Sequence, residues 1–202
     1  MANWRVIENT GRTIVRLIER QIAILGIPGV TVALSSAEAF PLLAAASQPF
    51  ISVFLFQIGI NGEMRNRPPQ RRADGSYGRQ SLPLELSYLI TPWSVRAAND
   101  IASDSLATGE EARLLGAVMQ ALYDNAEVGR GDLFEPVPVW APDDGMQMVL
   151  ESLPVDQHYR IWDAAELGYH LSAVYRARVA SLEPTPDAAG APVVEAGVEL
   201  VP

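Results

Sequence analysis

The stretch LPLELSYLIT, residues 82–91, decides the fold. Every second residue is apolar or amphipathic, and this two-residue period is typical of a β-strand with one buried face. Glu85 and Ser87 fall on the opposite face, which we expect to be available to a neighbouring subunit. The residues that we expect in the core are Leu82, Leu84, Leu86, Tyr88 and Ile90.

The same stretch permits a catalytic interpretation. The competing hypothesis is a small hydrolase or transferase that uses Glu85, Ser87 and a histidine, His158 or His170. The sequence contains no GxSxG elbow, HExxH pair, glycine-rich phosphate loop or acidic calcium loop. Strand alternation explains these residues without chemistry, so we expect no enzyme activity, no metal site and no cofactor. Asp143-Asp144-Gly145 is interpreted in the same way, as a solvated turn.

A second strand is predicted upstream, at FISVFLFQIGI, residues 50–60. It is rich in β-branched and aromatic residues, and near its start both faces are apolar, as in a central strand. Asn61-Gly62 follows, which favours a type I′ turn and a paired strand at residues 63–67. The proline- and glycine-rich RPPQRRADGSYGRQ, residues 67–80, then reads as a loop leading to residue 82.

Two long helices are expected. The first spans Trp4 to Leu25 and ends at Gly26 and Pro28, because glycine caps a helix and proline cannot continue it. The second begins at Thr108, which forms a capping box with Glu111. The residues expected on the buried faces are Trp4, Ile7, Ile14, Ile18, Ile22 and Leu25 in the first helix and Leu114, Leu115, Val118, Met119 and Leu122 in the second.

The remaining segments complete an α+β pattern. We predict strands at residues 29–34, 146–153 and 170–182, an irregular connector at 129–145, and a short helix at 155–165 with Trp162 inward. The predicted fold is therefore a single α+β domain, residues 1–183, with a mixed, mainly antiparallel sheet flanked by two or three helices. Residues 184–202 form an extended C-terminal arm, because three prolines precede the β-prone VVEAGVELV.

Composition excludes several classes of function. The net charge of −9 argues against nucleic acid as the main partner, since phosphate binding needs clustered positive charge. All 15 basic residues are arginine and there is no cysteine, which removes lysine Schiff bases, thiol nucleophiles and thiolate metal sites. The N-terminus lacks signal-peptide order and no apolar run reaches the roughly 20 residues of a membrane span. We expect a cytoplasmic product without membrane insertion.

Two segments are candidate interfaces. Five arginines fall between residues 65 and 79 of an otherwise acidic chain, and arginine is favoured in interface ion pairs. The alternative for them is a solvated loop. The arm can add a strand to a partner's sheet through main-chain hydrogen bonds. The candidate interface residues are Arg65, Arg67, Arg71, Arg72 and Arg79 in the first segment and Val193, Val194, Val198 and Leu200 in the second.

The ordered motifs carry a family resemblance. ISVFLFQIGINGEMRNR, LPLELSYLIT, EEARLLGAVMQALYDN and YHLSAVYRARV occur in this order, with an IW-containing helix before the last. Together they resemble cap, or tail-terminator, proteins of extracellular contractile injection systems of the antifeeding-prophage type, which are phage-tail-like machines. The resemblance covers roughly residues 5–182.

The resemblance implies a structural role without catalytic residues. Members of such a family form a ring, expected to be a hexamer, that closes the baseplate-distal end of the inner tube and sheath and terminates assembly. The chain would then be made in the cytoplasm and become part of the assembled particle. Residues 184–202 would reach the sheath. A neck or connector protein of a phage tail is the alternative within this class.

Overall fold

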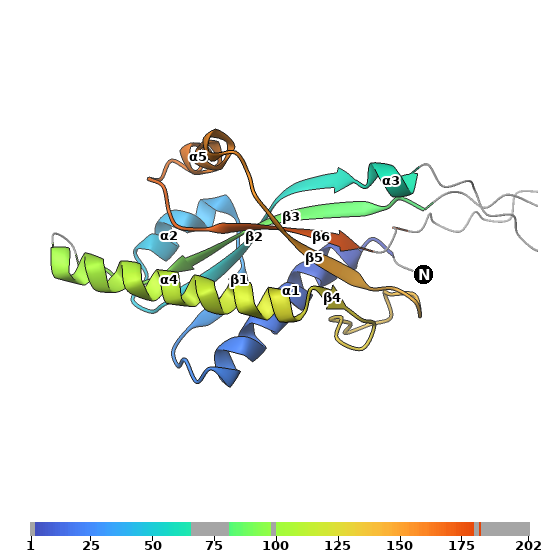
Figure 1. Ribbon diagram of the computed structural model, residues 1–202, viewed down its shortest axis with the longest axis horizontal. Helices are drawn as coiled ribbons and strands as arrows, with labels where there is room; N and C mark the ends of the chain where they lie inside the picture. Colours follow the sequence, from blue (N-terminus) through green and yellow to red (C-terminus); the bar gives the residue numbers. More distant parts are fainter. Residues whose placement is uncertain (1–2, 66–80, 98–99, 180–181, 183–202) are drawn as a thin grey trace, which may run out of the picture.

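The computed structural model describes residues 3–65, 81–97, 100–179 and 182. These residues form one six-stranded sheet with helices on both faces (Figure 1), which confirms the predicted α+β class. In chain order the elements are α1 (Val6–Ile24), β1 (Thr31–Leu34), the 3-10 turn η1 (Ala37–Ala39), α2 (Phe40–Ala44), β2 (Phe50–Ile60), α3 (Gly62–Arg65), β3 (Leu84–Trp93), α4 (Ile101–Asp124), β4 (Glu127–Val128), β5 (Met146–Glu151), α5 (Val155–Ala164) and β6 (Ala173–Val179).

The strand order is β1-β2-β3-β6-β5-β4. Only β1 and β2 run parallel, and the other neighbouring pairs are antiparallel, so the sheet is mixed and mainly antiparallel as predicted. The opening stretch forms β3, at the centre of the sheet. Because β3 has a strand on each side and helices over both faces, almost all of it is buried.

This central position corrects one prediction. Ser87 is only 6% exposed, so it does not lie on a face open to a neighbour. Leu82 is more exposed than expected, because it precedes β3 and forms only an isolated bridge with Leu182. The remaining predicted core residues of this stretch are buried, namely Leu84, Leu86, Tyr88 and Ile90.

Helices α1 and α4 cover one face of the sheet and form the larger core with it. The buried side of α1 carries Val6, Ile14, Ile18 and Ile22, and its arginines face solvent. Trp4 and Leu25 lie outside the helix and are exposed, so they were wrongly assigned to the core. Met119 on α4 was also wrongly assigned, since it is 38% exposed near the end of its helix.

The other face is covered only at one end, by α2 and α5 (Figure 1). There Phe40, Trp93 and Trp162 meet with ring centroids 5.4 to 6.0 Å apart, which is within the range of favourable aromatic contacts. Trp162 is 1% exposed, so its predicted inward position is confirmed. The sequence analysis did not predict η1 and α2.

The predicted hairpin at Asn61-Gly62 is wrong. The chain forms the short helical turn α3 there, and the Asn61 side-chain carbonyl accepts a hydrogen bond from the Met64 N–H at 3.2 Å. An asparagine side chain that caps a helical turn competes with a hairpin turn for the same residues. The strand antiparallel to β2 is instead β3, more than twenty residues further along the chain.

The predicted start of α4 is also wrong. Asp100 is the N-cap, and its carboxylate accepts a hydrogen bond from the Ala102 N–H at 3.0 Å. Thr108 lies inside the helix, where its hydroxyl donates to the Asp104 carbonyl at 2.9 Å. The alanine and leucine residues that precede Thr108 favour a helix. The helix therefore extends back to Asp100, whose carboxylate is a stronger cap than the Thr108 hydroxyl. Within the described ranges, no helix is long and apolar enough to cross a bilayer.

Candidate assembly surfaces

The half of the sheet that α2 and α5 leave uncovered carries a charged cluster. Cross-strand pairing places Glu85 of β3 opposite Arg178 of β6, and Arg176 beside it on the same face. Arg178 Nε lies 3.2 Å from a Glu85 oxygen, and Arg176 pairs with both Glu85 and Glu151 of β5. Two carboxylates and two guanidinium groups therefore link three strands in a charge-balanced, partly exposed surface. Such pairs contribute little to stability but define what this face can bind.

The cluster bears on the hydrolase hypothesis. Glu85 is held by two arginines, and Ser87 is buried in the sheet opposite Arg176. His158 lies on α5, and His170 lies beside Trp93 at the end of the sheet that α5 covers. The described residues therefore do not bring the glutamate, the serine and a histidine into one site.

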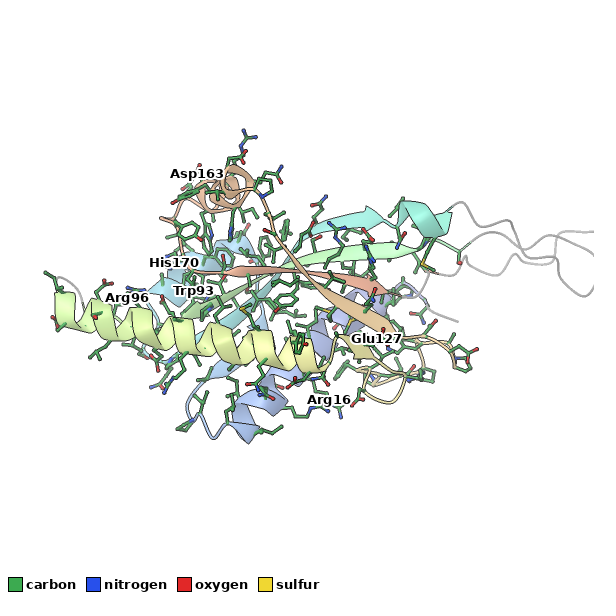
Figure 2. The ribbon with its side chains drawn as sticks, viewed as in Figure 1. Arg16, Trp93, Arg96, Glu127, Asp163 and His170 are labelled. Carbon is green, nitrogen blue, oxygen red and sulfur yellow. The ribbon has the colours of Figure 1, made fainter. Side chains whose placement is uncertain are left out.

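The histidines have structural surroundings (Figure 2). The His170 ring lies 4.7 Å from the Trp93 ring and 5.3 Å from the Trp162 ring, measured between centroids. His158 Nε2 lies 2.7 Å from the Ser172 hydroxyl. Burial lowers the pKa of both imidazoles, so each is held in its neutral form more strongly than in water. In the described part of the chain, no group of three or more His, Asp or Glu side chains could hold a metal ion.

Asp143 and Asp144 form the predicted turn. The Asp144 carboxylate accepts a hydrogen bond from the Ala141 N–H at 2.6 Å. The Asp144 N–H in turn donates to the Ala141 carbonyl at 3.1 Å. The side chain of Asp144 is thereby used to hold the local backbone.

An ion pair with a buried carboxylate joins α4 to the segment that follows β3. Glu111 is 4% exposed, and its carboxylate lies 2.6 Å from Arg96 Nη2 and accepts a hydrogen bond from the Ser94 N–H at 3.2 Å. Arg96 also pairs with Asp104 one turn from the helix start. Burial opposes the charge on Arg96, but its hydrogen bonds to Glu111 raise its pKa overall. Figure 2 shows Arg96 at the same end of the sheet as Trp93 and His170.

Helix α4 also carries exposed apolar side chains. Its first turns project past the sheet (Figure 1), and there Ile101 is 88% and Leu106 77% exposed. At its other end a hollow of about 350 Å³ opens between the helix and β5. Exposed apolar patches of this kind mark protein contact sites. The hollow is lined by Met119, Gln120, Leu122, Tyr123, Ala126, Met148, Leu150 and Tyr175.

Comparison with known families assigns the chain. The family model of the Pvc16 N-terminal domain matches residues 10–196, which is nearly the whole sequence. The chain belongs to the Pvc16 N-terminal domain family.

Two solved structures are similar to this Pvc16 N-terminal domain, and the first supports the assignment at the level of the fold. One match is the PVC sheath/tube terminator of an extracellular contractile injection system in its extended state, with 16% identity, a TM-score of 0.56 and coverage of 100% of this chain and 67% of the other. Another is the anti-feeding prophage tube-terminating cap, with 17% identity, a TM-score of 0.47 and coverage of 77% and 51%. No curated protein sequence matches the chain.

All but one of the interface residues predicted for this Pvc16 N-terminal domain lie outside the described structure. The loop arginines from Arg67 to Arg79 and the arm residues from Val193 to Leu200 fall in undescribed segments. Arg65 is the last residue of α3, and its side chain is not described. The sequence did not predict the exposed apolar surfaces on α4. Whether an apolar residue of a helix is buried or exposed depends on which other elements pack against it.

Proposed function

We propose that this protein is a structural cap that closes the baseplate-distal end of the tube and sheath of a contractile injection system and terminates assembly. The observation that carries the proposal is the fold likeness, over the full length of this chain, to a protein described as a sheath/tube terminator. Membership of the Pvc16 N-terminal domain family supports it. The role needs shape and contact surfaces, and it requires no catalytic group and no cofactor.

A cap of this kind acts as a ring of identical copies, for which we expect six. Closed rings use one surface patch to contact a different patch on the next copy. Helix α4 offers one candidate patch at each end. The first is the exposed pair Ile101 and Leu106 on its projecting end, and the second is the hollow beside Leu150 at its other end. The ring would contact the last layer of inner tube and of sheath, after synthesis in the cytoplasm.

The C-terminal arm, residues 184–202, is the segment that we propose to join the cap to a neighbouring subunit by strand addition. A chain that ends at Glu183 retains every element of the described fold, so it is expected to fold with an unchanged unfolding midpoint. It is expected to lose capping, which is measured by electron microscopy of particles assembled with sheath and tube. Capping at the full-length level by the truncated chain would contradict a role for the arm.

The arginine loop is proposed as a second contact. The double substitution Arg71→Glu and Arg72→Glu is expected to weaken association with particles, because arginines at interfaces pair with acidic groups. The effect should shrink as salt is raised from 0.05 to about 0.5 M, since exposed charges are screened within a Debye length. Substitution of the exposed Arg113 on α4 is the control. Equal association of wild type and double variant at low salt would leave the loop as solvated surface.

A further inference from the structure

One edge of the sheet is only partly covered. Strand β1 pairs with β2 from Phe50 to Val53 and then leaves the sheet, while β2 continues to Ile60. Within the described ranges, no strand lies beside residues 54–60 on this side. An uncovered strand presents a row of free N–H and C=O groups, which is a template for another strand.

The direction of the backbone groups can be assigned. The Asn61 N–H donates to the Pro83 carbonyl of the neighbouring chain segment at 3.0 Å. Backbone groups of an antiparallel strand point alternately to either side, so those of Ile60 and Ile58 point away from β3, toward the open edge. The side chains of these two residues are 45% and 53% exposed. The edge therefore combines free hydrogen-bonding groups with exposed apolar side chains.

A side-chain hollow lies at the start of this edge, where β1 leaves β2. Its volume is about 450 Å³, and Trp4, Gly11, Leu34, Leu55 and Tyr88 line it. The Tyr88 hydroxyl is buried there and has no hydrogen-bond partner among the described residues. A Cβ at Gly11 would lie 2.8 Å from Leu34 and 3.4 Å from the Tyr88 hydroxyl, so the Leu34 side chain would have to shift. The hollow can take an apolar side chain.

The C-terminal arm has the sequence that such an edge requires. Val194, Ala196, Val198 and Leu200 alternate with Glu195, Gly197 and Glu199. As a strand, residues 194–200 would therefore have one apolar face and one acidic face, and the end residues Val193 and Val201 would lie on the same side as the two glutamates. The apolar face suits the row formed by the hollow, Ile58 and Ile60, and the acidic face would remain in water.

We propose that the open edge of β2 receives residues 193–201 of a neighbouring copy of this chain. This inference rests on the proposed ring and names the contact that closes it. The arm follows Leu182, which pairs with Leu82 on the side of β3 away from β2. Residues 183–192 include three prolines, and a proline-rich linker of ten residues spans about 31 Å at roughly 3.1 Å per residue. A linker of that span is long enough to reach a neighbouring copy.

The exchange gives each copy one donor and one acceptor. Such a head-to-tail contact closes into a ring when the rotation between copies is right. The acceptor is then a copy of this chain rather than the sheath, which the sequence analysis expected. The main-chain hydrogen bonds tolerate many sequences, whereas the hollow and the two isoleucines select the apolar face of the arm.

Disulfide trapping tests the exchange, because the chain contains no cysteine. One full-length chain carries Ile58→Cys, and a second, size-tagged chain carries a single cysteine at residue 194, 196, 198 or 200. The two are mixed, alone and in particles assembled with sheath and tube, and oxidised mildly. We expect a disulfide-linked pair of the two different chains for at least one arm position, since the bond forms only at Cα separations of about 4.4–6.8 Å.

Val149→Cys on β5 is the matched control, because Val149 is 37% exposed, lies outside the hollow beside α4, and β5 is separated from β2 by β3 and β6. It should not form the linked pair. The inference is overturned if no arm position links to residue 58, if Val149→Cys links equally well, or if a chain with both cysteines links only within itself. Linkage of the arm to sheath alone also overturns it. Capping of particles is measured separately. If particles are capped but no disulfide-linked pair forms, the proposed function stands and only the strand exchange is wrong. If the linked pair forms but particles are not capped, only the proposed function is wrong.

Discussion

Replacing Trp162 by alanine is expected to lower the free energy of unfolding by about 3–5 kcal/mol, the range for removing a buried aromatic side chain. Trp162 is 1% exposed and packs between Phe40 and His170, with ring centroids 5.4 and 5.3 Å away. It is the buried residue by which α5 attaches to the sheet. Its loss opens a cavity and also releases the helix.

Urea denaturation followed by circular dichroism measures this change. Tyr159→Ala on the same helix is the control, because Tyr159 is half exposed and contacts only Tyr169 among the rings described, at 4.8 Å. Its substitution is expected to cost about 1 kcal/mol or less. Equal losses for the two variants would mean that α5 is not anchored through Trp162.

Replacing Arg96 by alanine is expected to cost about 2–4 kcal/mol, somewhat below the range for breaking a fully buried pair because Arg96 is partly exposed. The substitution leaves the Glu111 carboxylate buried. Of its hydrogen bonds within the described residues, only that from the Ser94 N–H remains. The helix α4 would then lose the ion pair that joins it to the segment after β3.

Thermal or urea unfolding checks this prediction, with Arg113→Ala as the control on the same helix. Arg113 pairs with Glu110 at 3.6 Å on the surface, and its removal is expected to cost under about 0.5 kcal/mol. A further variant, Arg96→Ala with Glu111→Gln, should recover part of the loss because the buried charge is gone. If Arg96→Ala behaves like Arg113→Ala, the pair does not hold the helix.

Most strands and helices could be predicted because each has its own hydrophobic period. The alternation at residues 82–91 and the apolar run at 50–60 identify β3 and β2, and the three- and four-residue steps identify α1. Pairing partners were harder. Asn61-Gly62 is a strong local signal for a hairpin, but the tertiary structure pairs β2 with β3 and uses Asn61 as a cap.

Burial on both faces was also hard to predict. Ser87 is small and polar, and alternation placed it on an open face. In the structure it is buried because β3 is central and other strands and helices surround it. A single strand's period shows which residues share a face, but not how much covers each face.

The candidate contact surfaces depend even more on distant parts of the chain. The open edge of β2 exists because β1 stops at Leu34, and the hollow beside it needs Gly11 of α1 to lie over Tyr88 of β3. No short motif encodes such an arrangement. The arm stays a prediction: prolines followed by an alternating apolar segment indicate a detached strand, and residues 184–202 lie outside the described structure.

The proposed cap function has one most direct test, which is electron microscopy of particles assembled from tube, sheath and baseplate with and without this chain. With the full-length chain, we expect particles of uniform length with a ring at the end opposite the baseplate. Without it, we expect open ends and either uncontrolled lengths or sheath lost from the tube. Particles with the same closed ends and the same length distribution in its absence would contradict the account.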